Sequence, residues 1–166
     1  MHILTRIPRL APALGLALLL AASSAWATTQ PVRSHDHRAT STTLDLSPDG
    51  HKWASDASLS RAMQRIRDVL QPDAETILAD RLDKRQYRRF AKSINGVIAD
   101  MVANCSLPVE ADARFHIILA QMMDGVAAME GQDEIGTRRE GAVMILAAIE
   151  KYAMYFDAPE FEPVRR

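Results

Sequence analysis

The residues of this chain best suited to hold a ligand are a methionine and a histidine in its apolar, helix-forming part. Met63 and His116 each lie about eight residues into a predicted helix. At a rise of about 1.5 Å per residue, both would lie at one level of a bundle in which these two helices run parallel. A thioether facing an imidazole across a bundle can hold a b-type haem or a copper ion. Methionine also fills bundle cores, so packing is the alternative interpretation of Met63.

His116 lies at the flank of its predicted helix, next to Phe115. It shares a side stripe with Leu119 and Met123, so we expect the imidazole to be partly buried. Asp112 precedes His116 by one helical turn and can accept a hydrogen bond that fixes the tautomer of the ring. The sequence offers no nucleophile to accompany a general base. His116, with Phe115 beside it, is therefore interpreted either as a structural histidine held by Asp112 or as part of a ligand site.

Further candidate metal ligands lie in the polar segment near the N-terminus. His35 and His37 flank an aspartate, and His51 follows further on. Histidines on a flexible chain can bind copper or zinc weakly, but ligands scattered over such a length define no geometry. A solvated arm that binds nothing is the alternative interpretation.

Cys105 is the only cysteine, so the chain cannot form an internal disulfide and must be stabilised by its core. Its place at the end of an apolar helix face favours an inert buried thiol. Dimerisation through a disulfide and redox sensing are the alternatives. We expect Cys105 and His116 to lie about 10 Å apart along a helical hairpin, too far to share a metal ion.

Basic side chains follow one face of the second long helix, opposite its apolar face. They are Arg81, Arg85, Arg88 and Lys92, with Lys84 and Arg89 beside them. Cations at a helix N-terminus interact unfavourably with the helix dipole. Their presence despite this small cost in stability suggests that they bind a partner. An anionic surface or an acidic periplasmic protein is the partner that this stripe would fit, and a plain solvated face is the alternative.

The first 27 residues have the pattern of a cleaved export signal. Arg6 and Arg9 precede an apolar run that is too short to span a bilayer, and Ala25 and Ala27 supply the small residues of a cleavage site. We expect cleavage after Ala27 and a periplasmic or, alternatively, secreted product that does not span the membrane. Loss of the two arginines changes the net charge from −1 to about −3, which argues against nucleic acid as a partner.

Four stretches of the chain show helical spacing of apolar residues. Asp83 to Gln86 and Thr137 to Glu140 form capping boxes before the second and fourth helices, and a short further turn is expected between residues 73 and 81. The four inward stripes are Leu59, Ala62, Met63, Ile66, Val69 and Leu70; Tyr87, Phe90, Ile94, Val97, Met101 and Cys105; Phe115, Ile118, Met122, Val126 and Met129; and Ala142, Ile145, Ile149, Tyr152 and Phe156. Met154 is also assigned to packing, and no strand is expected.

Long helices joined by short loops predict an all-α fold, an up-down-up-down four-helix bundle. The expected organisation is a signal peptide over residues 1–27, a disordered polar arm over 28–54, the bundle over 55–158 and a C-terminal tail over 159–166. We expect Trp53 to end the arm and to dock it onto the bundle.

Two segments resemble cytochrome b562, a periplasmic four-helix haem protein. They are Ala62–Ile66, which resembles the segment carrying that family's methionine ligand, and Phe115–Gln121, which resembles a stretch of its third helix. The resemblance implies haem b as a cofactor and Met63 as a ligand. The family's histidine ligand follows a tyrosine in the fourth helix, whereas here Tyr152 precedes Ala153. The segments 53–56, 104–107 and 155–157 also resemble small, uncharacterised exported helical proteins of proteobacteria, which implies no function.

No nucleophile–base pair, closed set of metal ligands or phosphate-binding loop is present in the sequence. We therefore expect a non-enzymatic periplasmic binding or accessory protein in metal or stress homeostasis. A haem-binding electron carrier and a protein-interaction module without a ligand are the alternatives. The cofactor is expected to be haem b, copper or none.

Overall fold

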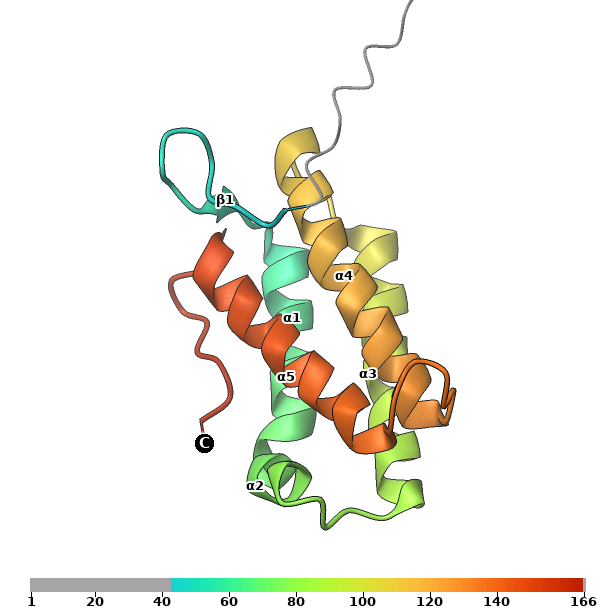
Figure 1. Ribbon diagram of the computed structural model, residues 1–166. Coiled ribbons are helices and arrows are strands. Elements are labelled where there is room, and N and C mark those ends of the chain that lie inside the picture. The colour runs from blue at the N-terminus through green and yellow to red at the C-terminus, as the bar shows by residue number, and fades with distance from the viewer. Residues whose placement is uncertain (1–42, 166) are drawn as a thin grey trace, which may run out of the picture. The chain divides into compact units, whose positions relative to one another are not determined.

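The computed structural model describes residues 43–165, and this part of the chain is mostly helical (Figure 1). Its four long helices are α1 (Ala57–Leu70), α3 (Lys84–Asn104), α4 (Val109–Glu130) and α5 (Arg138–Tyr155). A 3-10 turn, η1 (Gln71–Asp73), and a short helix, α2 (Ala74–Leu78), connect α1 to α3. The prediction of an all-α chain is confirmed. The proposed export signal, its cleavage site and the histidines at 35 and 37 lie outside the described residues.

The helices begin where the sequence provides capping side chains. Both predicted capping boxes are present: Asp83 accepts from the backbone of Gln86 at 2.8 Å, and the Gln86 side chain accepts from the Asp83 N–H at 2.9 Å. At α5, Thr137 and Glu140 make the same reciprocal pair. Each box satisfies N–H groups that the first turn of a helix leaves without partners. α4 ends at Gly131, whose φ of 110° is one that glycine adopts without strain.

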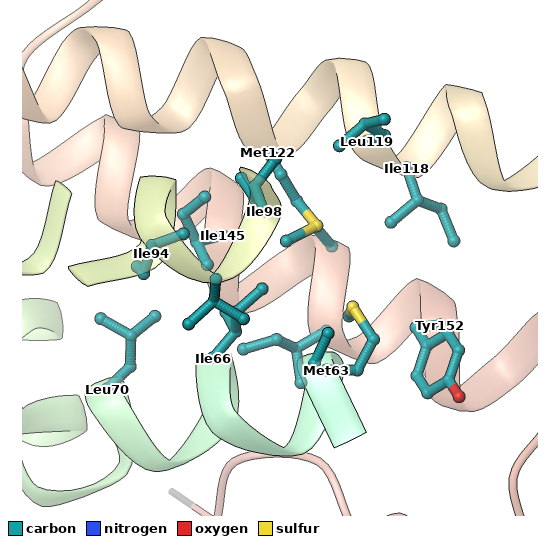
Figure 2. Packing of buried hydrophobic residues seen from close by; sticks show 14 of the residues in the cluster. Met63, Ile66, Leu70, Ile94, Ile98, Ile118, Leu119, Met122, Ile145 and Tyr152 are labelled. Atoms are coloured by element: carbon teal, nitrogen blue, oxygen red, sulfur yellow. The ribbon is translucent and has the colours of Figure 1, made fainter. Parts of the chain in front are cut away.

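The predicted apolar stripes form one core between the long helices (Figure 2). Ile66 on α1, Ile94 on α3, Met122 on α4 and Ile145 on α5 are completely buried. The exception is Met154, which was assigned to packing but is 59% exposed. It lies one residue before the end of α5 and two before the buried Phe156, so it falls on the outer side of the last turn.

Among the described residues α4 and α5 make the most extensive helix–helix contact, and two glycines lie where they meet. A Cβ added to Gly141 would lie 2.5 Å from the carbonyl oxygen of Gly125. A Cβ added to Gly125 would lie 2.7 Å from the carbonyl oxygen of Gly141. The two backbones therefore approach to a distance that no side chain at either position would allow.

A short parallel strand pair, which the sequence did not predict, joins the two ends of the described region. β1 (Trp53–Ala54) pairs with β2 (Phe156–Asp157), with Trp53 opposite Phe156. Phe156, expected at the end of the fourth helix, is buried in β2 instead. Trp53 is buried as expected, and its Nε1 donates to the Asp45 carbonyl at 2.5 Å. The last residues of the predicted arm are thus part of the fold.

The predicted C-terminal tail also packs against the helices. Phe161 meets Tyr152 edge to face, with ring centroids 4.9 Å apart, and Val164 is buried. Tyr152 also stacks on Phe156 at 5.5 Å. Gln71 holds the backbone of Arg165 through both ends of its amide. The segment from residue 156 to 165 therefore covers one end of α5 and one side of α1.

Asp56 connects the start of α1 to the loop between α3 and α4. One carboxylate oxygen accepts from the Leu59 N–H at 2.6 Å and the other from the Ser106 N–H at 2.5 Å. Burial acts to raise the pKa of Asp56, but these two bonds and one from the Cys105 thiol hold it below the usual value. The ionised side chain thus stabilises contacts between distant parts of the chain.

We expect Asp56→Ala to lower the free energy of unfolding at pH 7 by about 2–3 kcal/mol, since it removes a helix cap and a second charge-assisted hydrogen bond. Asp56→Asn keeps one acceptor and should lose less. Because the pKa of Asp56 is lower in the folded state, its contribution is present above about pH 4 and is lost as the pH falls through the folded-state pKa. Urea unfolding of the three proteins at pH 7 and pH 3 measures this. A stability of Asp56→Ala equal to wild type at pH 7 would refute it.

Candidate functional site

The structure places Met63 and His116, the two predicted ligands, in different environments. Met63 is completely buried in the core, next to Ile66 and Met122 in Figure 2. The His116 side chain is 63% exposed, so the expectation that it is partly buried is wrong. His116 lies on the outer side of α4, because the adjacent Phe115 takes the inward position. Met63 does not line the pocket beside His116.

The predicted contact between His116 and Asp112 is present. The Nδ1 atom of His116 lies 2.9 Å from the backbone carbonyl oxygen of Asp112 and 3.5 Å from its carboxylate. A carbonyl oxygen can only accept, so Nδ1 carries the hydrogen in this bond. In the neutral imidazole the lone pair is then on Nε2, which is the arrangement that orients a histidine for binding a metal.

The C-terminal end of α3 and the first turns of α4 enclose a small pocket of about 120 Å³. Its lining residues are Met101, Val102, Cys105, Asp112, Phe115, His116 and Leu119. Cys105 and His116, which we expected too far apart to act together, thus line the same pocket. The loop between α3 and α4 is short, so it brings the end of one helix beside the start of the next.

The Cys105 thiol is protonated at neutral pH. Burial, the nearby charge of Asp56 and the hydrogen bond that the thiol donates to that carboxylate raise its pKa to about 11. A thiol in this state reacts slowly with oxidants and disulfides, because the thiolate is the nucleophile. The environment of Cys105 therefore favours the interpretation of an inert thiol over that of a redox sensor.

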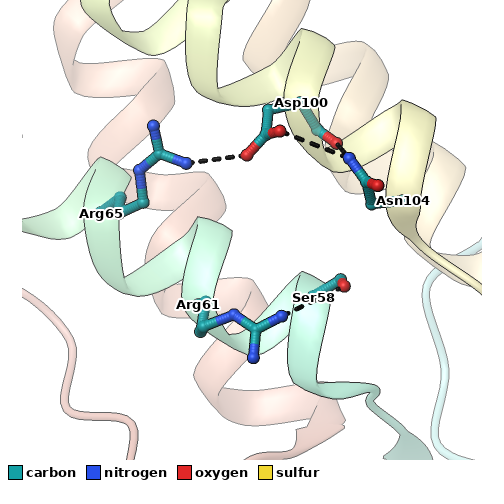
Figure 3. A network of polar contacts seen from close by, with 5 residues as sticks. All are labelled: Ser58, Arg61, Arg65, Asp100 and Asn104. Atoms are coloured by element: carbon teal, nitrogen blue, oxygen red, sulfur yellow. Dashed lines mark hydrogen bonds and ion pairs between the residues drawn. The ribbon is translucent and has the colours of Figure 1, made fainter.

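A second pocket, of about 310 Å³, lies between α1 and α3. Its polar side chains are those of Figure 3: Ser58, Arg61, Arg65, Asp100 and Asn104. Arg65 and Asp100 form an ion pair at 2.8 Å across the pocket. None of these residues was singled out from the sequence. The spacing of these residues could have indicated the pocket. Arg61 and Arg65 are four residues apart and share one face of α1, and Asp100 and Asn104 have the same spacing on α3.

A third pocket, of about 440 Å³, lies between α1 and the C-terminal segment. It is lined by Ser60, Arg61, Gln64, Ala158, Pro159, Glu160 and Phe161. The Ser60 hydroxyl is hydrogen bonded to Tyr152 at 3.1 Å and to Ser55 at 3.0 Å. This hydroxyl cluster satisfies the buried Tyr152 oxygen. No histidine or cysteine is among the lining residues.

The predicted basic stripe is exposed to solvent along its whole length. Arg81, Arg85, Arg88 and Lys92 are all exposed, and within residues 43–165 none of them forms an ion pair. Lys84 and Arg89 are exposed beside them. The stripe begins at Arg81, just before α3, and continues on the solvent side of the N-terminal half of that helix.

Comparison with known proteins gives no assignment. No family model matches the chain, and neither the curated proteins nor the solved structures contain a significant match. Between Thr43 and Arg165, no helix combines the length and the apolar character that a membrane span requires. In the same part of the chain, His, Cys, Asp and Glu side chains form no group of three or more that could hold a metal ion.

Proposed function

We propose that this chain is an exported, non-enzymatic metal-binding protein that takes up a soft cation, Cu(I), in the periplasm. In this proposal the signal peptide is cleaved after Ala27, and the long helices form an up-down-up-down bundle that carries the site. The observation behind the proposal is that Met101, Cys105 and His116 line one pocket between α3 and α4. A thioether, a thiol and an imidazole are the donors that Cu(I) prefers.

The contacts of His116 support this choice of site. Asp112 holds the Nδ1 side of the ring at 2.9 Å, so that Nε2 carries the lone pair of the neutral imidazole. Cys105 is half-buried, and Met101 lies at the inner end with 2% of its surface exposed. Cu(I) binding displaces the proton of the Cys105 thiol. Thioether and thiolate donors in an apolar pocket then favour a monovalent soft ion over hard divalent cations.

Titration of the reduced protein with Cu(I), in competition with a chromogenic chelator, tests the proposal. We expect one equivalent to bind. Cys105→Ser and His116→Gln should weaken binding by about 10- to 100-fold, the range known even for residues that support metal ligands. Met63→Leu, a volume-conserving change in the core, should leave the affinity unchanged. Equal Cu(I) affinity in wild type, Cys105→Ser and His116→Gln would exclude this site.

The same proteins test the cytochrome b562-like alternative. Haem b bound through Met63 would give a Soret band on titration with haem, and Met63→Leu would weaken it. We expect no such band, because the Met63 side chain is enclosed by the core and His116 lies on the surface.

A protein-interaction module is the second candidate, and one feature of α4 favours it. Its outward face carries Val109, which is 86% exposed, and Met123, which is 56% exposed, with Val102 on the neighbouring α3 at 60%. The basic stripe is the other surface that such a partner could use. Capture of a periplasmic protein by wild type that is lost when Arg81, Arg85, Arg88 and Lys92 are replaced by glutamine would assign the interaction to the basic stripe. Capture that survives this change would assign it to the apolar face.

A further inference from the structure

The pocket between α1 and α3 forms a groove that contains two arginines. They differ in how many of their N–H donors already have an acceptor. Arg65 forms its ion pair with Asp100 at 2.8 Å. Arg61, one turn earlier on α1, reaches only the Ser58 hydroxyl, at 3.5 Å (Figure 3). A guanidinium group has five N–H donors in a planar fork that matches a carboxylate. Arg61 lines this groove and also the pocket beside the C-terminal segment. Within the described residues, the long bond to Ser58 leaves most of its N–H donors without an acceptor.

The charges of the groove define the charge of a matching ligand. Two guanidinium groups and one carboxylate line it, and no other charged side chain does. The site thus has a net charge of about +1, which a singly charged anion neutralises. A doubly charged phosphate would leave an excess negative charge beside Asp100, at a repulsive distance for two anions.

Asn104 gives the groove an acceptor opposite the arginines. Its amide nitrogen donates to Asp100 twice, to the backbone oxygen at 2.7 Å and to the carboxylate at 3.3 Å. Both bonds use the nitrogen, so the amide oxygen is left to accept a hydrogen bond. Ala62 and Met101, both nearly buried, form the apolar floor. A volume of about 310 Å³ is at the lower end of the range for small-molecule sites.

From this arrangement we propose that the α1–α3 groove binds a small monocarboxylate that also carries a hydroxyl or amino group, as in a short α-hydroxy acid. The carboxylate lies on the Arg61 fork, and Arg65 supplies a second positive charge that Asp100 holds in place. The hydroxyl or amino group donates to the Asn104 oxygen. The short carbon chain lies on Ala62 and Met101. The site shares the Met101 side chain with the proposed metal site, but it uses only the apolar surface of that side chain and needs no bound metal.

Isothermal titration of the mature protein with lactate, acetate, lactamide and inorganic phosphate tests this proposal. Lactate is expected to bind saturably and more tightly than acetate, which lacks the donor, and than lactamide, which lacks the charge. Arg61→Gln should weaken lactate binding about tenfold, since a charge-assisted hydrogen bond is lost. Asn104→Ala should remove the preference for lactate over acetate.

Arg88→Gln is the matched control, because it removes one exposed arginine of α3 that does not line the groove. It should change lactate affinity by less than about twofold. Arg61 is exposed, so Arg61→Gln is expected to fold, and an unchanged melting temperature together with unchanged Cu(I) binding would show that it does. Absence of saturable lactate binding, or equal weakening by Arg61→Gln and Arg88→Gln, would overturn the proposal. Tighter binding of phosphate than of lactate would overturn the assignment to a monocarboxylate.

Discussion

Ile94→Asp is expected to lower the free energy of unfolding by about 4 kcal/mol and the melting temperature by roughly 15 °C. Ile94 lies in the middle of α3 with none of its surface exposed, among side chains from α1 and α5 (Figure 2). A carboxylate at this position would be buried without a positive partner, or would have to be protonated to stay there. Circular dichroism at 222 nm during heating and urea unfolding at pH 7 measure both quantities.

The matched control is Asn95→Asp, which introduces the same side chain one residue further on, at an exposed position. Its stability should stay within about 0.5 kcal/mol of wild type. A far-UV spectrum and melting temperature of Ile94→Asp equal to those of wild type would mean that α3 is turned differently about its axis.

Gly141→Val is expected to destabilise the protein by about 3 kcal/mol, because it forces α4 and α5 apart. A Cβ at residue 141 would lie 2.5 Å from the Gly125 carbonyl oxygen and 2.9 Å from both the Met129 nitrogen and the Ala128 Cβ. Two of these three atoms belong to the backbone of α4, so no rotamer change can relieve the contact. Urea unfolding measures the loss.

Gly96→Val is the control for this prediction, since Gly96 is also helical but has open space where a Cβ would be. The same substitution there should change stability by less than about 1 kcal/mol. If the two variants were equally stable, the close approach of α4 and α5 at residues 125 and 141 would be refuted.

Local sequence signals predicted the helices and their inward faces with few errors. Capping boxes depend on residues three positions apart, and an apolar stripe depends on the period of a single helix. Both signals are local, so the starts of α3 and α5 and the burial of residues such as Ile94 and Tyr152 followed directly from the sequence. The assignment of Met154 to packing failed because it lies two residues after the inward Tyr152, which places it on the opposite side of α5.

The candidate sites depended on contacts that no local pattern contains. The pairing of Trp53 with Phe156 joins segments about a hundred residues apart. The separation of Met63 from His116 followed from the rotation of α4, which turns Phe115 inward. The pocket shared by Cys105 and His116 formed because the α3–α4 loop is short.

The sequence by itself determined that the chain forms capped amphipathic helices and which face of each helix is buried, because helical periodicity and capping are properties of neighbouring residues. Only the tertiary structure decided which polar faces meet. Arg61 and Arg65 lie opposite Asp100 and Asn104 because α1 packs beside α3 at one particular register. That register is fixed by side-chain packing in the core between the helices, and such contacts become visible only when the helices are assembled.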